Sequence, residues 1–406
     1  MGIKGLAKSS LIVVLAMVCG YLLLVVASMI PQKLIYTHIS EVSEKMYYEG
    51  NYPSLYMNGA YIENFSDADA YAVAYNQRYN NPFINALDAF NYAYDQDTTH
   101  RGVKALYFTI PGSLNTIYEH SHAWHGYRII LRPLLIFWNL ADIRSICFYI
   151  VSILSIFTCC LLYNRNSKFI SVFPFAVSIL FFFFTLESMT FLFFLDFVIM
   201  LASCIFIIIM ADSNISNIAT IMTLTGFAVA YFDLFNMPLI TVGFPIVLWI
   251  SISNSPAKKK LTDSISLYIH WFLGFALTTF TKMLISHFMF PGSSSSKAFR
   301  WYTGIIGNFT ISDRFKAIQH LIFRAFDMSN IRQFLIMVFI ISLVIGVIKK
   351  INTLNPYHFF AYVIPALIPF VWIFVLPVHA TMDWTIFIFA ITIYSLLQLS
   401  VDLLFT

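Results

Sequence analysis

Charged residues are scarce in this sequence. Only 11% of its 406 residues are Asp, Glu, Lys or Arg, while 59% are hydrophobic. A water-soluble domain of this length needs many more polar side chains to cover its surface. The composition therefore excludes a soluble globular protein and predicts an integral membrane protein. The formal net charge is only +4, which implies no nucleic-acid partner.

Cysteines are missing from the polar segments. All five lie inside hydrophobic runs, where a thiol behaves as a small apolar group. They are Cys19, Cys147, Cys159, Cys160 and Cys204. The long polar segments therefore hold no disulfide bond, which argues against a disulfide-stapled external domain and leaves the redox compartment open.

Long apolar runs dominate the rest of the chain. They are too long for transmembrane β-strands, which need only about 10 residues. We therefore predict an all-α fold, a polytopic membrane bundle of about ten helices of roughly 20 residues each. The 42 Phe and 23 Tyr residues suit lipid-facing helices with aromatic belts. The predicted spans are 10–30, 143–163, 169–186, 189–210, 215–233, 237–253, 264–288, 332–349, 357–377 and 384–402.

The first apolar run follows a basic start, as a signal peptide would. It ends at Pro31 without a small-residue cleavage site, so we interpret it as an uncleaved first span. With both termini in the cytoplasm, every short basic turn lies on the cytoplasmic side. These turns contain Lys4, Lys8, Arg165, Lys168, Lys258, Lys259, Lys260, Lys349 and Lys350.

This topology assigns the long polar segments to the outside. The predicted parts are a first transmembrane helix (1–30), an external loop (31–142), transmembrane helices two to seven (143–288), a second external loop (289–331) and transmembrane helices eight to ten (332–406). We expect both external loops to carry short amphipathic helices. Most side chains capable of chemistry lie in the two loops or at the outer ends of helices, so we expect the function on the outer face.

An acidic cluster lies in the first external loop. Ser66 and Asp69 have the spacing of a capping box, with Ser66 as the N-cap of a helix. Alternatively, one carboxylate serves as a general base that takes a proton from an attacking hydroxyl. Asp67 and Asp69 are two residues apart and point to different faces of a helix, so only one can be the base. Asp67 is the first choice because the capping box does not need it, and Glu63 completes the cluster.

The stretch HSHAWHGYRIILRPLL later in the same loop is rich in cations and aromatic rings. Arg128 and Arg132 are four residues apart, so on a helix they share a face and can bind one phosphate or pyrophosphate. Pro133 is suited to begin a new helix. Alternatively, this is an interfacial helix whose arginines bind lipid phosphates and whose Trp124 and Tyr127 lie in an aromatic belt.

The same stretch contains His120, His122 and His125. A metal site is compatible with their spacing, but no cysteine is near and the only close carboxylate is Glu119. We therefore expect no metal and no cofactor, and assign His122 and His125 to hydrogen bonding with a sugar or phosphate.

Two ionisable residues lie within predicted spans. Lys282 and Asp196 are costly in hydrocarbon unless they are paired or face water, so both are functional candidates. The alternatives are snorkelling for Lys282 and a structural bond between helices for Asp196. Further candidates for substrate binding lie in the second external loop or at outer helix ends: Asp233, Arg300, His379 and Asp383.

The order of these parts resembles the GT-C superfamily of membrane glycosyltransferases. The shared features are a first span, a long external loop with short helices and an acidic cluster, many closely spaced spans, and a later basic external loop. The resemblance implies sugar transfer from a polyprenyl-phosphate donor. It also implies a base in the loop, here Asp67 or Asp69, and binders of the donor phosphate drawn from Arg128, Arg132, Lys282 and Arg300.

We therefore expect an inverting, metal-independent glycosyltransferase in a bacterial cytoplasmic membrane. Its partners would be a polyprenyl-phosphate-linked sugar, a glycan or lipid-linked acceptor, and membrane lipids. The alternative is a non-enzymatic flippase or transporter of a lipid-linked glycan, in which Lys282 and Asp196 line the translocation path.

The predicted orientation is testable with topology reporters. Fusions after Phe90 and Thr310 should report the external side, because both positions follow an odd number of predicted crossings. Fusions after Lys260 and Ile351 should report the cytoplasm. Alkaline phosphatase and green fluorescent protein reporters measure the two sides independently. A cytoplasmic signal at Phe90 would overturn the external placement of the first loop.

Overall fold

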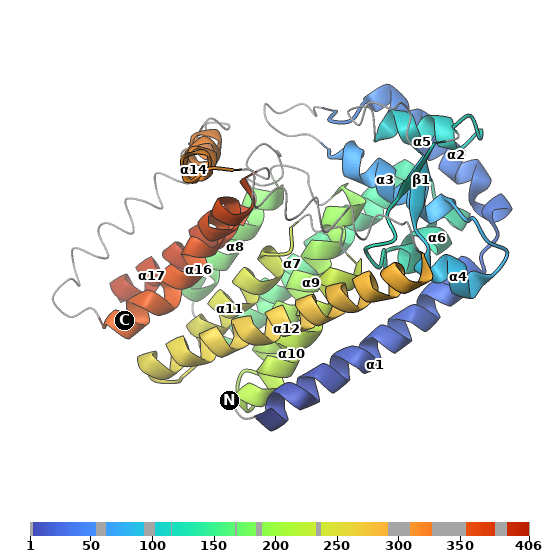
Figure 1. Cartoon of the computed structure of the whole chain (residues 1–406). Coiled ribbons are helices and arrows are strands. Elements are labelled where there is room, and N and C mark those ends of the chain that lie inside the picture. The colour runs from blue at the N-terminus through green and yellow to red at the C-terminus, as the bar shows by residue number, and fades with distance from the viewer. Residues whose placement is uncertain are drawn as a thin grey trace.

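The computed structural model describes residues 3–53, 62–92, 102–114, 116–166, 169–183, 189–232, 237–290, 309–326, 355–377 and 388–405. Within these ranges the chain is almost entirely helical, with one small two-stranded sheet, which confirms the predicted all-α membrane bundle (Figure 1).

Membrane-spanning helices make up most of the structure. Six described helices are long and apolar enough to cross a bilayer: α1 (Ile3–Ser28), α7 (Leu140–Asn166), α9 (Phe191–Ile209), α10 (Ile215–Phe232), α12 (Ala257–Met289) and α16 (Pro356–Val375). Shorter apolar helices lie among them: α8 (Phe169–Phe183), α11 (Ile240–Ile252) and α17 (Phe389–Phe405). Each coincides with a predicted span, whereas the predicted span 332–349 lies outside the described residues.

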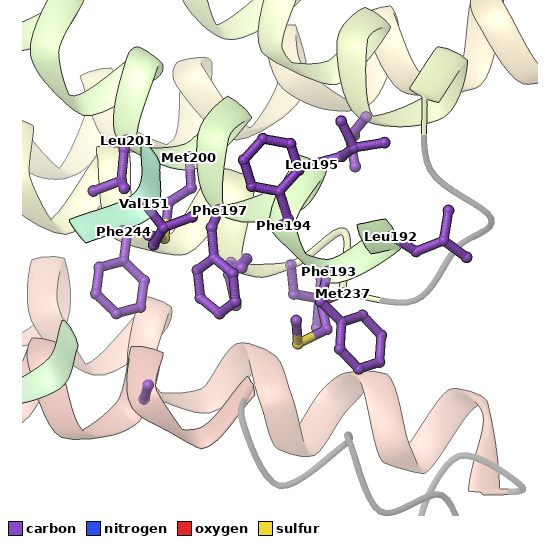
Figure 2. Packing of buried hydrophobic residues seen from close by; sticks show 14 of the residues in the cluster. Val151, Leu192, Phe193, Phe194, Leu195, Phe197, Met200, Leu201, Met237 and Phe244 are labelled. Carbon is purple, nitrogen blue, oxygen red and sulfur yellow. The ribbon is translucent and has the colours of Figure 1, made fainter. Parts of the chain in front are cut away.

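Helix α9 forms the centre of the bundle. It is apolar around most of its circumference, as expected of a helix enclosed by other helices. Figure 2 shows its side chains packed beside Val151 of α7 and Phe244 of α11. The α9 residues labelled there are Leu192, Phe193, Phe194, Leu195, Phe197, Met200 and Leu201.

Helices α10 and α12 pack with their backbones in contact. A Cβ atom at Gly226 would overlap the carbonyl oxygen of Trp271, and one at Gly274 would overlap that of Thr223. Small residues permit this close approach, because packing between helices in a membrane relies on van der Waals contact rather than on water exclusion.

A layer of short elements covers one end of the bundle, and we call it the cap layer. It contains α2 (Gln32–Glu49), α3 (Asn64–Tyr75), α4 (Pro82–Leu87), β1 (Phe90–Tyr92), α5 (Val103–Thr109), β2 (Ile117–Glu119) and α6 (Arg128–Phe137) (Figure 1). Strands β1 and β2 are antiparallel, with Asn91 opposite Tyr118. We call the bundle end beside the cap layer the outer end, and the end where α1 begins the inner end.

Two local predictions in the cap layer are wrong. Helix α3 begins at Asn64, and its N-cap is Glu63, whose carboxylate accepts the N–H of Ser66; the predicted capping box of Ser66 and Asp69 does not form. Pro133 lies inside α6 instead of beginning a helix. In both cases, contacts with other elements determine where the helix begins, and they override the local sequence signal.

The predicted second external loop contains an amphipathic helix, as expected. Helix α14 (Ile311–Phe326) packs against α16. Arg314 donates hydrogen bonds to the carbonyl oxygens of Phe374 (2.6 Å) and Val375 (3.1 Å) at the end of α16. These carbonyls have no partner within their own helix, so the cation stabilises the helix end.

Candidate functional site

The structure describes the predicted site residues of the first loop and of α12. Glu63, Asp67 and Asp69 lie at or in α3. His122, His125, Arg128 and Arg132 lie in or just before α6, and Lys282 lies in α12. The candidates Asp233, Arg300, His379 and Asp383 lie outside the described residues.

Asp67 binds the start of the central helix. Its side chain is 1% exposed, and its two carboxylate oxygens accept the backbone N–H groups of Phe191 (2.8 Å) and Leu192 (3.1 Å). The first N–H groups of a helix have no partner within the helix, and the positive end of the helix dipole favours an anion. Burial nevertheless outweighs these bonds and raises the pKa of Asp67 to about 6. Asp67 therefore ties α3 to α9.

Glu63 lies beside the same helix start. It is 3% exposed, and its carboxylate accepts the N–H of Ser66 at 3.0 Å. Its own backbone N–H donates to the hydroxyl of Thr190, the N-cap residue of α9, at 3.2 Å. Burial raises the pKa of Glu63 to about 8, and the negative charge of Asp67 acts in the same direction. Glu63 and Asp67 form an acid pair at the outer end of α9.

A cation and a tyrosine accompany the acid pair. Arg144 of α7 binds both carboxylate oxygens of Glu49 (3.0 and 2.7 Å) and the side-chain oxygen of Asn64 (2.7 Å). The charge of Arg144 also acts to lower the pKa of Asp67. The hydroxyl of Tyr71 is buried without a hydrogen-bond partner among the described residues. This site therefore combines two protonatable acids with one cation that is already hydrogen-bonded.

Asp69 faces another part of the cap layer. Its carboxylate accepts a hydrogen bond from the side chain of Asn91 in β1 at 2.9 Å. Asp67 and Asp69 thus point to different elements, which confirms the prediction that they lie on different faces of the helix.

Arg128 closes the end of α4. Its side chain is 4% exposed, and its guanidinium donates to four main-chain carbonyl oxygens. Three belong to Asn85 (2.9 Å), Ala86 (2.7 Å) and Asp88 (3.0 Å), and the fourth to His125 (3.3 Å). A charged donor satisfies several carbonyls that the end of the helix leaves without partners.

Arg132 and Lys282 bind helix ends in the same way. Arg132 donates to carbonyl oxygens of Ala27 and Ile30 at the end of α1 and of Ala74 at the end of α3. Lys282 is fully buried; its ammonium donates to the carbonyl of Leu87 at the end of α4 (2.5 Å) and lies 5.8 Å from the ring of Trp124. Arg132 and Lys282 therefore join the cap layer to the bundle, whereas Arg128 joins α6 to α4 within the cap layer.

Asp88 is a charged residue of this region that the sequence analysis missed. Its carboxylate is buried, accepts the hydroxyl of Ser121 at 3.2 Å and lies 3.5 Å from Nε of Arg78. Arg78 also pairs with Glu119 at 2.9 Å. Asp88 follows a short helix and matches no motif, so only the contacts across the cap layer reveal its partners.

His125 is hydrogen-bonded within the cap layer, whereas Nδ1 of His122 is buried without a hydrogen-bond partner among the described residues. The ring of His125 is buried and contacts the hydroxyl of Tyr127 (3.0 Å) and the carbonyl of His120 (2.8 Å), and burial holds its pKa well below the usual value. Burial also lowers the pKa of His122 to about 4, and the charge of Lys282 acts in the same direction. The described part of the chain contains no group of three side chains suited to hold a metal ion.

Comparison of this chain with protein families, curated proteins and solved structures finds no match.

The raised pKa of Glu63 predicts a pH-dependent stability. The folded protein keeps the proton up to a pH of about 8, whereas the unfolded chain releases it near 4.5, so the folded state is progressively penalised as pH rises between these values. Glu63→Gln removes this titration and should flatten the decline in melting temperature over that range.

Glu44→Gln provides the control, because Glu44 is an exposed carboxylate of α2. Its melting temperature should follow the wild-type dependence on pH. Equal slopes for Glu63→Gln and wild type in differential scanning fluorimetry would contradict the assignment.

Proposed function

We propose that this chain is a membrane glycosyltransferase that transfers a sugar from a polyprenyl-phosphate carrier to a glycan or lipid-linked acceptor. The observation that carries the proposal is the buried acid pair of Glu63 and Asp67, where the cap layer meets the outer end of α9. Carboxyl groups with a pKa raised toward neutrality are suited to proton transfer. The order of spans and loops, which resembles GT-C enzymes, gives the reaction class.

Glu63 is the better candidate for the base. Both oxygens of Asp67 accept N–H groups of α9, so moving Asp67 toward a substrate would uncover the start of the central helix. Asp69 is bound to Asn91. The carboxylate of Glu63 is held by Phe65 and Ser66 at the start of its own helix, and its raised pKa makes it a stronger base than an ordinary carboxylate. Glu63 therefore replaces Asp67, the first choice from the sequence, as the proposed general base.

The proposed reaction inverts the anomeric carbon in one displacement. The acceptor hydroxyl attacks the anomeric carbon of the donor sugar, and ionised Glu63 takes the hydroxyl proton as the new C–O bond forms. The bond between the anomeric carbon and the phosphate oxygen breaks, and its electron pair leaves with polyprenyl phosphate. No metal is required, because the leaving group departs as a stable phosphate anion.

The proposed location is the outer face of a bacterial cytoplasmic membrane, with both termini in the cytoplasm. The lipid donor would approach through the surrounding bilayer, so membrane lipids are partners as well. The alternative, a transporter of a lipid-linked glycan, gains no support from Lys282 and Asp196. Lys282 binds the end of α4, and Asp196 accepts the N–H of Met237 at 3.3 Å, deep in the bundle.

Sugar transfer in isolated membranes tests the proposal. A panel of radiolabelled polyprenyl-phosphate sugars is offered to membranes that contain the wild-type chain, Glu63→Gln or Asp69→Asn. Loss of a general base should lower turnover by about 100-fold or more at saturating donor. Asp69→Asn should stay within about fivefold of wild type, because losing the bond to Asn91 costs at most about 1 kcal/mol. Wild-type turnover should rise with pH toward about 8 as Glu63 ionises.

Asp67→Asn separates the structural role from catalysis. It loses part of the contact with α9, so the yield of folded protein should fall, whereas Glu63→Gln should fold normally. Full turnover by Glu63→Gln would remove it as the base. Absence of transfer by the wild type with every donor, together with transbilayer movement of a lipid-linked glycan, would replace the enzyme with the transporter.

A further inference from the structure

A cavity with several polar side chains in its lining lies at the inner end of the bundle, away from the acid pair. It has a volume of about 210 Å³ and is lined by residues of α1, α10 and α12. Its polar lining consists of Lys8, Ser9, Ser216, Thr220, Ser266 and His270. Among the described residues that line it, none is acidic. A lysine surrounded by hydroxyl groups favours an anion with several oxygens.

Hydroxyl groups surround the ring of His270 at the cavity wall. The hydroxyls of Thr223 and Ser9 both lie within hydrogen-bond distance of Nδ1 of His270, at 3.1 and 3.2 Å. The hydroxyl of Thr223 also bonds to the carbonyl of Ala219 at 2.9 Å. Ser9, which is 3% exposed, is thereby held against the cavity beside Lys8.

The cavity lies where membrane spans begin. Lys8 and Ser9 belong to the first turn of the α1 span, which starts at Ala7, and Ser216 to the first turn of the α10 span, which starts at Ile215. Lipid phosphates occupy this level of a bilayer. Helix α12 has 33 residues, more than the roughly 20 that crossing requires, so its Ser266 and His270 reach this level from further along the helix. The positive end of the α10 dipole adds to the attraction for an anion.

We propose that this cavity, the inner phosphate site, binds a phosphate group carried by an anionic lipid headgroup. Lys8 supplies the charge, while Ser9 and the other hydroxyls bind the phosphate oxygens. Binding would hold α1, α10 and α12 together at the end opposite the cap layer. This site goes beyond the proposed sugar transfer and does not depend on it.

Thermal unfolding of the delipidated full-length chain in uncharged detergent tests the site. The probes are mixed micelles that contain dioleoyl phosphatidate, mixed micelles that contain dioleoyl phosphatidylcholine, and inorganic phosphate. Phosphatidate should raise the melting temperature more than phosphatidylcholine, because a ligand that binds only the folded state stabilises it. Lys8→Glu should weaken the apparent affinity by about tenfold or more. Ser9→Ala, which keeps the charge and the helix, should weaken it as well.

Lys259→Glu is the matched control. Lys259 is exposed near the start of α12 and does not line the cavity, so its variant makes the same charge change elsewhere and should keep wild-type affinity. Equal losses in Lys8→Glu and Lys259→Glu would reduce the effect to general surface charge and overturn the site. So would equal stabilisation by the two lipids. A Lys8-dependent response to inorganic phosphate alone would keep the phosphate site but overturn the lipid as its source.

Discussion

Buried cations bound to main-chain carbonyl groups hold the cap layer on the bundle. Arg132 joins the ends of α1 and α3, while Arg128 and Lys282 both bind the last turn of α4. A helix end leaves carbonyls without partners, and a buried cation lacks the water that would otherwise solvate it. The cation and the carbonyl groups therefore each provide the hydrogen-bond partner that the other lacks. The short helices of the cap layer depend on these contacts, because helices of this length are marginal without tertiary support.

The acid pair makes the equivalent contact with the opposite charge, because a carboxylate binds N–H groups at a helix start. Asp67 satisfies N–H groups at the start of α9, as the cations satisfy carbonyls at helix ends. This contact places Glu63 beside a second carboxyl group in buried surroundings, where its charged form is disfavoured and its pKa is raised to about 8. The contact that fixes the cap layer on α9 thereby creates the proton acceptor on which the proposed sugar transfer depends.

The spans could be predicted from the sequence because the length of an apolar run is a local property. The shared face of Arg128 and Arg132 could be predicted for the same reason. Their partners could not, because every residue carries a carbonyl group and no sequence pattern marks the one that a distant cation will bind. The N-cap of α3 shows a similar limit: residue preference favours Ser66, yet Glu63 takes the position, and its backbone N–H bonds to Thr190, which is 127 residues away.

Hydrogen–deuterium exchange of Arg132→Met measures the central claim most directly, since methionine keeps an unbranched apolar stem and removes the charge and the hydrogen-bond donors. Amides of residues 62–92 should exchange about tenfold faster or more, while α9 and α10 keep their protection. Arg165→Met, which removes an ion pair with exposed Asp212 at the inner end, should leave these amides unchanged. Wild-type exchange across residues 62–92 in Arg132→Met would contradict the claim that buried cations hold the cap layer.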